Sequence, residues 1–545
     1  MSDELKMVKM TIDGSQYEFP AGETILDAAK SVGIEIPHYC YHKGLSIAGA
    51  CRMCLVEIEK VPKLQIACYM TVGDDMVVFT KNERIKKARK AMLEFHLVNH
   101  PLDCPVCDQA GECKLQTYYM EHGLYISRVR ENKVKKAKKA VQIGPHVMLD
   151  QERCILCSRC VRFCNEIAKT SELGMFNRGD REIIDIFPGR QLDNPYSANV
   201  IDICPVGALL SKDFRFKTRV WYLETVNSIC TRCSRGCNIF IDYNIKRPWK
   251  NDGRRLSRLR PRYNGEVNDW WMCDEGRFGF DFVDAQTRLD TPLVSEGGVQ
   301  QVADWGQAVE VAAARLKVAA SEPGEVAVLV SPQLSNEALH VLKRVLAEQL
   351  PGTMTVFSNL NEHEVTEDDI LRKADKNPNT AGAQLLGFGP DSPGVKNIEF
   401  LLKAAAEGNI SALIVIAHDP VGLPAIYGKG WSEALDKVAF KIFIGCNANQ
   451  TSRTADIVLP LAAFAEHEST ITNIADRVQS LHRAFDPLAE SLPGWDLLAR
   501  LGNALGGEYS YGSAEEVFDE LVAREEKFAG LDYEKIGDCG IKING

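Results

Sequence analysis

Cysteine is distributed unevenly along this chain, and its placement constrains the fold more than any other feature. Sixteen of the 18 cysteines lie in residues 1–273, and only Cys446 and Cys539 follow. In a cytosolic protein, short cysteine spacings are typical of metal sites rather than of disulfide bonds. The sequence therefore predicts a first half built around metal centres and a second half with an ordinary apolar core.

Composition and hydropathy favour a globular protein without a membrane span. Hydrophobic residues make up 45% of the 545 residues. Apolar runs such as residues 411–417 are far shorter than the ~18 residues of a transmembrane helix. The opening segment MSDELKMVKM lacks the apolar stretch of a signal peptide. We therefore expect a protein on the cytoplasmic side of the membrane, which contacts the membrane only through partners.

Charge differs between the two halves. Residues 1–290 carry 44 Lys and Arg against 38 Asp and Glu, whereas residues 291–545 carry 20 against 36. A basic first half suits a protein that holds many thiolates, because thiolate cages are anionic. Basic runs at residues 81–90 and 133–140 leave a nucleic-acid surface as the alternative. No nucleic-acid motif accompanies them, and we expect no nucleic-acid partner.

The first residues predict a small α+β unit. Residues 7–19 predict a hairpin that turns at Asp13-Gly14. Residues 23–33 predict a helix that ends at glycine, and a cysteine-bearing loop then leads to a strand at residues 55–59. The unit is therefore a hairpin, a helix, a ligand loop and a strand.

The pattern changes twice further along the chain. Residues 82–98 predict an amphipathic helix that includes Phe95 among its apolar positions, and residues 101–123 predict a loop. From about residue 300, apolar strand-like runs alternate with helical stretches, which is typical of an α/β domain with a parallel sheet. The strand-like runs are residues 325–330, 412–417, 440–445 and 456–460.

The first cysteine set has the spacing C-x10-C-x2-C-x13-C. Three of its thiols lie in the ligand loop, and the fourth follows the strand. Four thiolates placed in this way can hold a [2Fe–2S] cluster; a structural zinc site or a buried fourth thiol is the alternative. The first set comprises Cys40, Cys51, Cys54 and Cys68.

The second set, in NHPLDCPVCDQAGEC, supplies three cysteines with the spacing C-x2-C-x5-C. Three thiolates do not complete the four ligands of a [4Fe–4S] cluster. A histidine shortly before the first cysteine is the nearest other donor; the alternative is a surface or capping histidine. The predicted ligands of the second set are His100, Cys104, Cys107 and Cys113.

The third set combines two segments. RCILCSRCVRFCNEI carries the bacterial ferredoxin spacing, in which the fourth cysteine of a run ligates the other cluster. Downstream, Cys204-Pro205 resembles the end of a second run whose other three positions hold no cysteine. Cys164 is then left over as a buried free thiol, with a ligand or redox role as the alternative. The predicted ligands of this [4Fe–4S] cluster are Cys154, Cys157, Cys160 and Cys204.

The fourth set joins SICTRCSRGCNIF to WWMCDEGRFG, with the spacing C-x2-C-x3-C-x35-C. A zinc ribbon usually pairs two C-x2-C steps, so this spacing favours a [4Fe–4S] cluster. Cys446 and Cys539 remain as core or surface thiols. The predicted ligands are Cys230, Cys233, Cys237 and Cys273.

One [2Fe–2S] and three [4Fe–4S] clusters without a substrate site predict an electron relay. The sequence contains no P-loop and no G-x-G-x-x-G between a strand and a helix. We therefore predict no catalytic residue in this chain, and electrons that enter and leave through partner chains.

At these motifs the sequence resembles the large iron–sulfur subunit family of respiratory complex I, which comprises the G subunit of bacterial NADH-quinone oxidoreductase and the 75 kDa subunit of mitochondria. The stretches GACRMCLVEIEK, NHPLDCPVCDQAGECKLQ, CILCSRCVRF, NVIDICPVGAL and RYNGEVNDWWMCDEGRFG match in order. The resemblance implies a β-grasp, ferredoxin-like [2Fe–2S] domain over residues 1–82. It implies [4Fe–4S] segments over residues 83–123, 145–215 (ferredoxin-like) and 223–280, the last found in only some bacterial members and off the electron path.

Residues 290–545 resemble a shortened α/β molybdopterin-oxidoreductase domain, most clearly in TADIVLPLAAFAEHESTITNIADRVQS. In catalytic members, a Cys, selenocysteine, Ser or Asp binds molybdenum. Here no cysteine lies between Cys273 and Cys446. We therefore expect no molybdopterin and a role as scaffold and docking surface.

The family implies an electron-transfer subunit in the peripheral arm of a proton-translocating NADH:quinone oxidoreductase, on the cytoplasmic side of the inner membrane. The [2Fe–2S] cluster would receive electrons from a flavin- and NADH-binding subunit. The third and second sets would pass them to downstream iron–sulfur subunits and quinone. The alternatives are a subunit of a soluble NAD-linked formate dehydrogenase or hydrogenase, and a zinc-bearing binding module.

Overall fold

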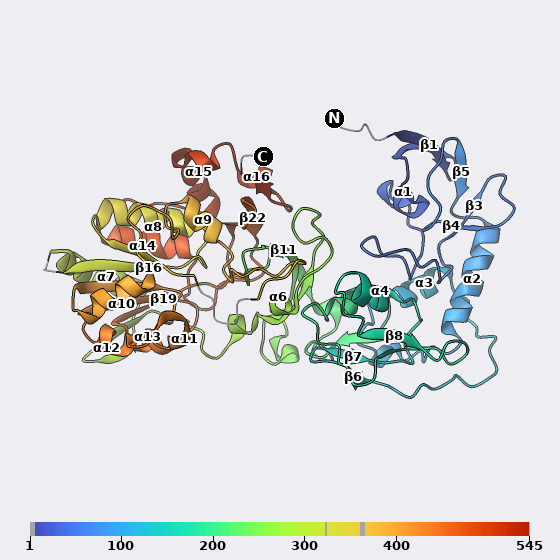
Figure 1. The fold of residues 1–545 in the computed structure, drawn as a ribbon, viewed down its shortest axis with the longest axis horizontal. Helices are drawn as coiled ribbons and strands as arrows, with labels where there is room; N and C mark the ends of the chain where they lie inside the picture. The colour runs from blue at the N-terminus through green and yellow to red at the C-terminus, as the bar shows by residue number, and fades with distance from the viewer. Residues whose placement is uncertain (1–5, 322–323, 360–365, 544–545) are drawn as a thin grey trace. The chain divides into compact units, whose positions relative to one another are not determined.

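A computed structural model describes residues 6–321, 324–359 and 366–543 (Figure 1). The chain divides into two compact units, residues 1–223 and residues 224–545, and each is described by itself. Among the described residues, no helix combines the length and the apolar character that crossing a membrane requires.

The first unit begins with the predicted hairpin. β1 (Met7–Ile12) and β2 (Ser15–Pro20) pair antiparallel around Asp13 and Gly14, whose φ angles are 48° and 91°. β1 also pairs in parallel with β5 (Met76–Phe79), and the five-stranded sheet has the order β2-β1-β5-β3-β4. Positive φ at both turn residues is what a tight two-residue hairpin requires.

The predicted helix and strand of this unit are also confirmed. α1 (Ile25–Ser31) begins after Thr24, whose hydroxyl oxygen accepts a hydrogen bond from the Asp27 N–H and so caps the helix. β3 (Leu55–Ile58) and β4 (Gln65–Ile66) complete the sheet. The ligand loop of the first set therefore lies between α1 and β3.

α2 (Glu83–Leu97) is the predicted amphipathic helix, but one residue of its predicted apolar face was wrong. Its fully buried positions are Ile85, Arg89 and Leu93, which are four residues apart and define one face. Phe95 follows Leu93 by two residues and therefore points away from that face, with 72% of its surface exposed.

The loop predicted over residues 101–123 is partly helical. α3 (Lys114–His122) begins directly after Cys113 and buries Leu115 and Tyr118, and α2 and α3 pack against each other. Tertiary packing stabilises this nine-residue helix, which is too short to be stable in isolation.

The rest of the first unit is made of short elements. A three-stranded sheet has the order β10-β7-β6, a two-stranded sheet pairs β8 with β9, and two helices carry parts of the third set. These elements are β6 (Val141–Gln142), β7 (Val147–Leu149), α4 (Arg159–Glu166), β8 (Leu173–Phe176), β9 (Ile183–Ile186), α5 (Asn199–Ile203) and β10 (Leu209–Ser211).

The second unit begins with a three-stranded antiparallel sheet in the order β11-β12-β13. The fourth cysteine set flanks this sheet. Its elements are β11 (Glu224–Ile229), β12 (Asn238–Tyr243), β13 (Leu256–Pro261) and α6 (Asp274–Phe278).

A seven-stranded sheet forms the centre of the second unit, with the order β15-β14-β20-β19-β18-β16-β17. The five strands from β20 to β17 are parallel, and the β14–β15 hairpin pairs antiparallel at the edge. The predicted α/β domain with a parallel sheet is therefore confirmed. The strands are β14 (Leu293–Glu296), β15 (Val299–Val302), β16 (Glu325–Val330), β17 (Met354–Phe357), β18 (Ile410–Ile416), β19 (Phe440–Gly445) and β20 (Ile457–Pro460).

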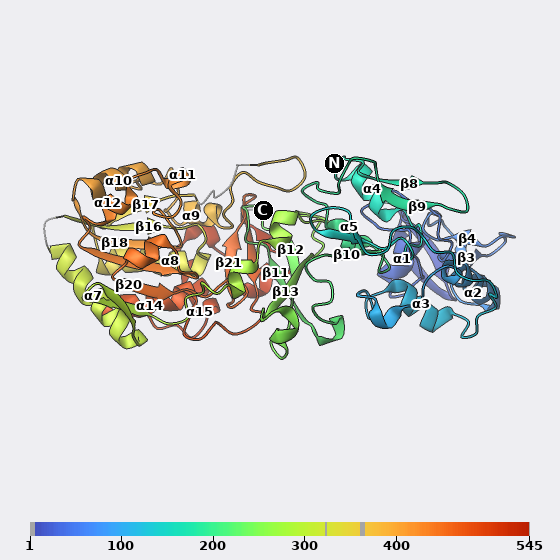
Figure 2. The same ribbon diagram turned by 90° about the horizontal axis from the view of Figure 1, so that it is seen from below.

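Helices cover both faces of this sheet (Figure 2). Val328 of β16 belongs to the core under α7, α8 and α14, whereas Ala327 and Leu329 belong to the core under α10 and α12. This alternation is expected for a strand buried on both faces. The main helices are α7 (Trp305–Ser321), α8 (Asn336–Gln349), α10 (Ile398–Ala406), α12 (Trp431–Leu435), α14 (Gly494–Ala504) and α15 (Ala514–Arg524).

Shorter elements complete the second unit. β21, β22 and β23 form a further antiparallel sheet. These elements are α9 (Thr380–Leu385), α11 (Pro424–Tyr427), α13 (Gln450–Thr454), β21 (Ser469–Thr472), β22 (Arg477–Leu481), α16 (Tyr533–Ile536) and β23 (Ile541–Lys542).

Candidate metal centres

The thiols of the first set lie in two pairs. Cys51 donates a hydrogen bond to Cys40, and Cys54 donates one to Cys68. The bond from Cys51 lowers the pKa of Cys40 to about 5, whereas donation and burial raise the pKa of Cys51 and Cys54. All four are at most 6% exposed. Two pairs of thiols fit a [2Fe–2S] cluster, because each of its two irons takes two protein ligands.

The second set lies between α2 and α3. His100, Cys104 and Cys113 line a cavity of about 350 Å³ together with apolar side chains such as Leu115. Burial lowers the pKa of His100 to about 4, so its imidazole is neutral at physiological pH. Its buried Nδ1 has no hydrogen-bond partner among the described residues. A neutral imidazole with an unpaired nitrogen fits the role of fourth ligand.

Cys107, the remaining member of the second set, does not line this cavity. It is 8% exposed and lies against the main chain of Gly207, where an added Cβ would come within 2.4 Å of its Sγ. Only glycine permits this close approach. Because Gly207 closely follows Cys204 in the sequence, the second and third sets are neighbours.

The third set surrounds a single apolar cavity. All four of its cysteines line this cavity together with Leu149, Ile184, Val206 and Arg159. Burial raises the pKa of Cys154 to about 11 and that of Cys204 to about 12. The structure therefore brings together two segments that are far apart in the sequence.

Cys164 does not line this cavity. It lies on α4, is fully buried, and burial raises its pKa to about 12. Its position outside the cavity that the four predicted ligands line supports its interpretation as a leftover thiol.

The fourth set lies at one end of the β11–β13 sheet. Its cysteines are at most 8% exposed, and Cys273 precedes α6, where its Sγ accepts a hydrogen bond from the Gly276 N–H at 3.3 Å. An added Cβ at Gly276 would lie 2.9 Å from the Sγ of Cys230. The main chain of α6 therefore passes close to two of the four sulfurs.

The chemistry of the donor sets fits iron–sulfur clusters, because fifteen thiols with one imidazole are donors suited to iron and thiolates are the usual ligands of such clusters. Among the described residues, no group of three or more His, Cys, Asp or Glu side chains is placed to hold one metal ion.

A large cavity lies in the second unit. It has a volume of about 510 Å³ and opens at the carboxyl ends of β18, β19 and β20, where open α/β sheets commonly bind ligands. Cys446 lines it, but its thiol donates to the Ala462 carbonyl at 3.5 Å and burial raises its pKa to about 12. Glu275 and Lys376, which form an ion pair at 2.9 Å, also line it.

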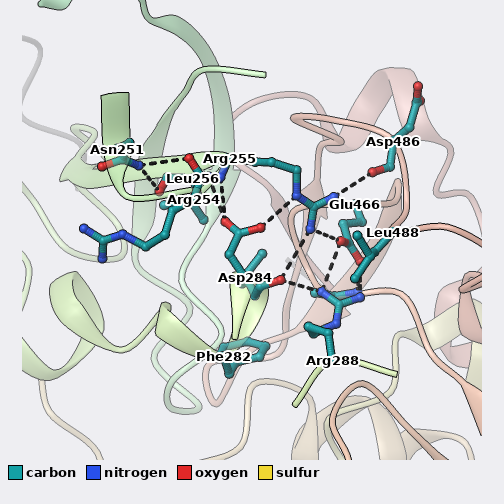
Figure 3. Close-up of polar contacts among 12 residues, drawn as sticks. Asn251, Arg254, Arg255, Leu256, Phe282, Asp284, Arg288, Glu466, Asp486 and Leu488 are labelled. Atoms are coloured by element: carbon teal, nitrogen blue, oxygen red, sulfur yellow. Dashed lines mark hydrogen bonds and ion pairs between the residues drawn. The ribbon is translucent and has the colours of Figure 1, made fainter. Parts of the chain in front are cut away.

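A buried ion-pair network in the second unit was not predicted from the sequence (Figure 3). Glu466 is fully buried and accepts hydrogen bonds from Arg288 at 2.8 and 3.1 Å, from Arg255 at 2.6 Å, and from the Ala463 N–H at 2.7 Å. Arg255 also pairs with Asp284 at 2.7 Å. The network joins the segment before β13 to the segment after β20.

Two arginines on α4, Arg159 and Arg162, were not predicted as site residues either. Their spacing of three residues within the third cysteine motif places them on one face of a helix. This spacing is the sequence feature that could have identified them as site residues. Both reach the main chain of the first set's loop.

Comparison with known families finds iron–sulfur domains over the segments that carry the first, second and third sets. The "2Fe-2S iron-sulfur cluster binding domain" matches residues 5–83, and the "NADH-ubiquinone oxidoreductase-G iron-sulfur binding region" matches residues 89–128. The "NADH-quinone oxidoreductase subunit 3, ferredoxin-like domain" matches residues 144–210, and "Molybdopterin oxidoreductase" matches residues 376–504. The predicted fold class is confirmed: ferredoxin-type iron–sulfur domains first, then a molybdopterin-oxidoreductase domain.

One solved structure, an NAD+-reducing [NiFe]-hydrogenase in the H2-reduced state, has a chain that aligns at 31% identity. The alignment covers 39% of this chain and 91% of that chain, with a TM-score of 0.36, which is too low to indicate a shared arrangement.

Curated relatives give the family. The G subunit of the NADH-quinone oxidoreductase of Rickettsia felis is 42% identical over 62% of this chain and 49% of its own length. The 78 kDa mitochondrial NADH-ubiquinone oxidoreductase subunit of Candida albicans is 41% identical over 66% and 49%, and the 75 kDa subunit of Reclinomonas americana is 41% identical over 68% and 52%. The chain spans about half the length of the curated relatives it matches. It belongs to the family formed by the G subunit of NADH-quinone oxidoreductase and the 75 and 78 kDa subunits of NADH-ubiquinone oxidoreductase.

Proposed function

We propose that this chain relays electrons inside an NADH:quinone oxidoreductase through one [2Fe–2S] and three [4Fe–4S] clusters. When bound, such a cluster accepts and releases one electron. The first set holds the [2Fe–2S] cluster, and the second, third and fourth sets each hold one [4Fe–4S] cluster. The chain's own side chains ligate the clusters, exclude water from them and fix their spacing.

One observation carries this proposal: three of the four sets share a single apolar core. Tyr39, Met53, Leu93 and Leu115 pack with cysteines of the first, second and third sets. Burial, net charge and hydrogen bonds to sulfur set the potential of an iron–sulfur cluster. A shared dry core therefore supports three centres that exchange electrons with one another.

Contacts between the sets support an order of transfer. The Arg162 guanidinium donates to the main-chain oxygens of Cys40 in the first set and Cys157 in the third set. Gly207, which follows the third set, lies against Cys107 of the second set. The third set thus contacts both others, and we infer the order first, third, second.

The proposal extends to partners and location. A flavin- and NADH-binding subunit delivers electrons at the first set, and downstream iron–sulfur subunits receive them from the second set on the way to quinone. The chain is peripheral, on the cytoplasmic side of the membrane, and proton translocation takes place in other subunits.

The second unit is proposed to be a scaffold without molybdopterin. Among the described residues that line its large cavity, the one cysteine is Cys446, whose thiol donates a hydrogen bond to the Ala462 carbonyl. This bond to the main chain, together with the absence of any cysteine between Cys273 and Cys446, supports a domain that does not ligate molybdenum.

Metal analysis of the anaerobically purified complex tests the proposal. We expect about 14 iron atoms per chain, from one [2Fe–2S] and three [4Fe–4S] clusters, with neither zinc nor molybdenum in stoichiometric amount. A colourless protein with stoichiometric zinc would contradict the relay, and stoichiometric molybdenum in this chain would contradict the scaffold role.

His100→Cys is expected to keep a cluster in the second set but to lower its reduction potential. The reason is that an anionic thiolate replaces a neutral imidazole, and negative charge disfavours the reduced cluster. Redox titration followed by EPR measures the change. The control is His96→Gln, near the same helix end but outside the ligand set, which leaves the reduction potential of the second-set cluster unchanged. A wild-type potential in His100→Cys would show that His100 is not a ligand.

A further inference from the structure

Arg162 of α4 connects the third set to the loop of the first set. Its Nη2 donates to the main-chain oxygen of Cys40 at 2.5 Å and of Cys157 at 3.3 Å, and its Nη1 donates to that of Ser46. One turn further along α4, the Glu166 carboxylate accepts hydrogen bonds from the Ser46 N–H at 2.8 Å and from its hydroxyl at 2.5 Å. One face of α4 therefore holds the loop that carries the first ligand of the first set.

Arg159 lies deeper on the same helix. It is 4% exposed and lines the cavity that the four cysteines of the third set surround. Its guanidinium donates to the main-chain oxygens of Ile203, at 3.0 Å, and Tyr41. Its buried Nε has no hydrogen-bond partner among the described residues.

Neither arginine has a carboxylate partner within the described ranges, where all their acceptors are carbonyl or hydroxyl oxygens. A buried cation is costly unless an anion compensates it. The sulfurs within electrostatic reach of Arg159 are those of Cys157, Cys204 and Cys40, which are thiolates when they ligate a cluster. These belong to the third and the first set.

We propose that Arg159 and Arg162 tune electron transfer between the first and third sets, with their positive charge compensating the thiolate-bound clusters and raising the reduction potential of both. This proposal rests on the proposed function, because it requires clusters in both sets.

The physical reason is electrostatic. One electron that moves from the first to the third set makes the third cage one unit more negative and the first one unit less negative, and no bond forms or breaks. A nearby fixed cation stabilises the more negative, reduced state of each cage more than its oxidised state. Arginine supplies that cation at every accessible pH. Both are positioning residues, since they act on the cages without ligating them.

Arg159→Gln in the full chain, assembled with its clusters, tests the proposal by redox-titrated EPR. At a fixed solution potential we expect the reduced-to-oxidised ratio of the third-set signal to fall about tenfold, which corresponds to 59 mV for one electron. Arg159→Lys keeps the charge and restores most of the ratio. The control is Arg178→Gln, an exposed residue between β8 and β9, which leaves the ratio unchanged. A ratio that stays at the wild-type value in Arg159→Gln overturns the proposal, and so does an equal fall in the Lys and Gln variants.

A second variant covers the case in which Arg159→Gln loses the cluster. Arg162→Gln removes a cation that is bonded to main-chain oxygens of both sets, and we expect the first-set and third-set signals to shift to lower potential while the fourth-set signal stays in place. Unshifted first-set and third-set signals would overturn the proposal. Wild-type protein without these EPR signals would instead contradict the proposed function itself, so the two failures are distinguishable.

Discussion

Cys204→Ser is expected to remove one [4Fe–4S] cluster and about four iron atoms per chain, whereas Cys164→Ser leaves the iron content unchanged. Cys204 lines the same cavity as Cys154, Cys157 and Cys160. A serine hydroxyl is a weak replacement for a soft thiolate at that position. Cys164 lies outside the cavity, within the apolar packing of α4, where serine loses only a buried thiol.

Iron analysis and EPR of the two variants, purified anaerobically side by side, measure this difference. Cys164→Ser is the matched control, because it makes the same atomic change in the segment that carries three of the predicted ligands. Loss of a cluster signal from Cys164→Ser, with Cys204→Ser intact, would reverse the ligand assignment. If the proposed relay is correct, electron transfer from NADH to quinone should also fail in Cys204→Ser, since the proposed order places its cage between the first and second sets.

The cysteine sets were predicted from sequence by local ligand spacing, and they remain predictions. Cys154, Cys157 and Cys160 are three residues apart, and a cage that needs four thiolates requires one more donor. Even Cys204 followed from the ferredoxin pattern, and the structure brings it to the same cavity. The parallel sheet of the second unit was equally predictable, because strands buried on both faces are continuously apolar.

The local sequence pattern was less informative where tertiary packing determines which residues are buried. Phe95 satisfies the apolar composition of α2, yet the buried face is set by Ile85, Arg89 and Leu93. The apolar pattern of α2 does not reveal which of its apolar residues contact the rest of the first unit. α3 was predicted as loop because a cysteine-rich segment precedes it and its own sequence is short and largely polar, so the helix depends on packing against α2.

The charged contacts could not be predicted at all. Arg288 and Glu466 are 178 residues apart in sequence, and Arg159 and Tyr41 are 118 residues apart. Pairing between residues so far apart in the sequence depends on the folded arrangement. The sequence around a single Arg or Glu does not indicate which residue it will contact. These side chains are where the structure adds most to the sequence.

Glu466→Gln is expected to lower the free energy of unfolding of the second unit by about 3–5 kcal/mol, the usual cost of removing one partner from a buried ion pair. The side chain of Glu466 is 0% exposed and that of Arg288 is 2% exposed, so water cannot replace the lost charge. Burial by itself lowers the pKa of Arg288, but the hydrogen bond and charge of Glu466, together with Cys446 and Asp284, outweigh burial and raise it. The glutamine therefore leaves Arg288 buried without its anion, and Arg255 loses the same partner.

Urea unfolding followed by tryptophan fluorescence measures this loss, because six of the seven tryptophans lie in residues 224–545. Glu468→Gln, two residues away and exposed, is the matched control and shifts the unfolding midpoint little. Arg288→Gln combined with Glu466→Gln should cost less than the sum of the two single variants, since neither then leaves the other's charge unpaired. Strict additivity, or an unfolding midpoint in Glu466→Gln equal to that of Glu468→Gln, would show that the Arg288–Glu466 ion pair does not stabilise the second unit.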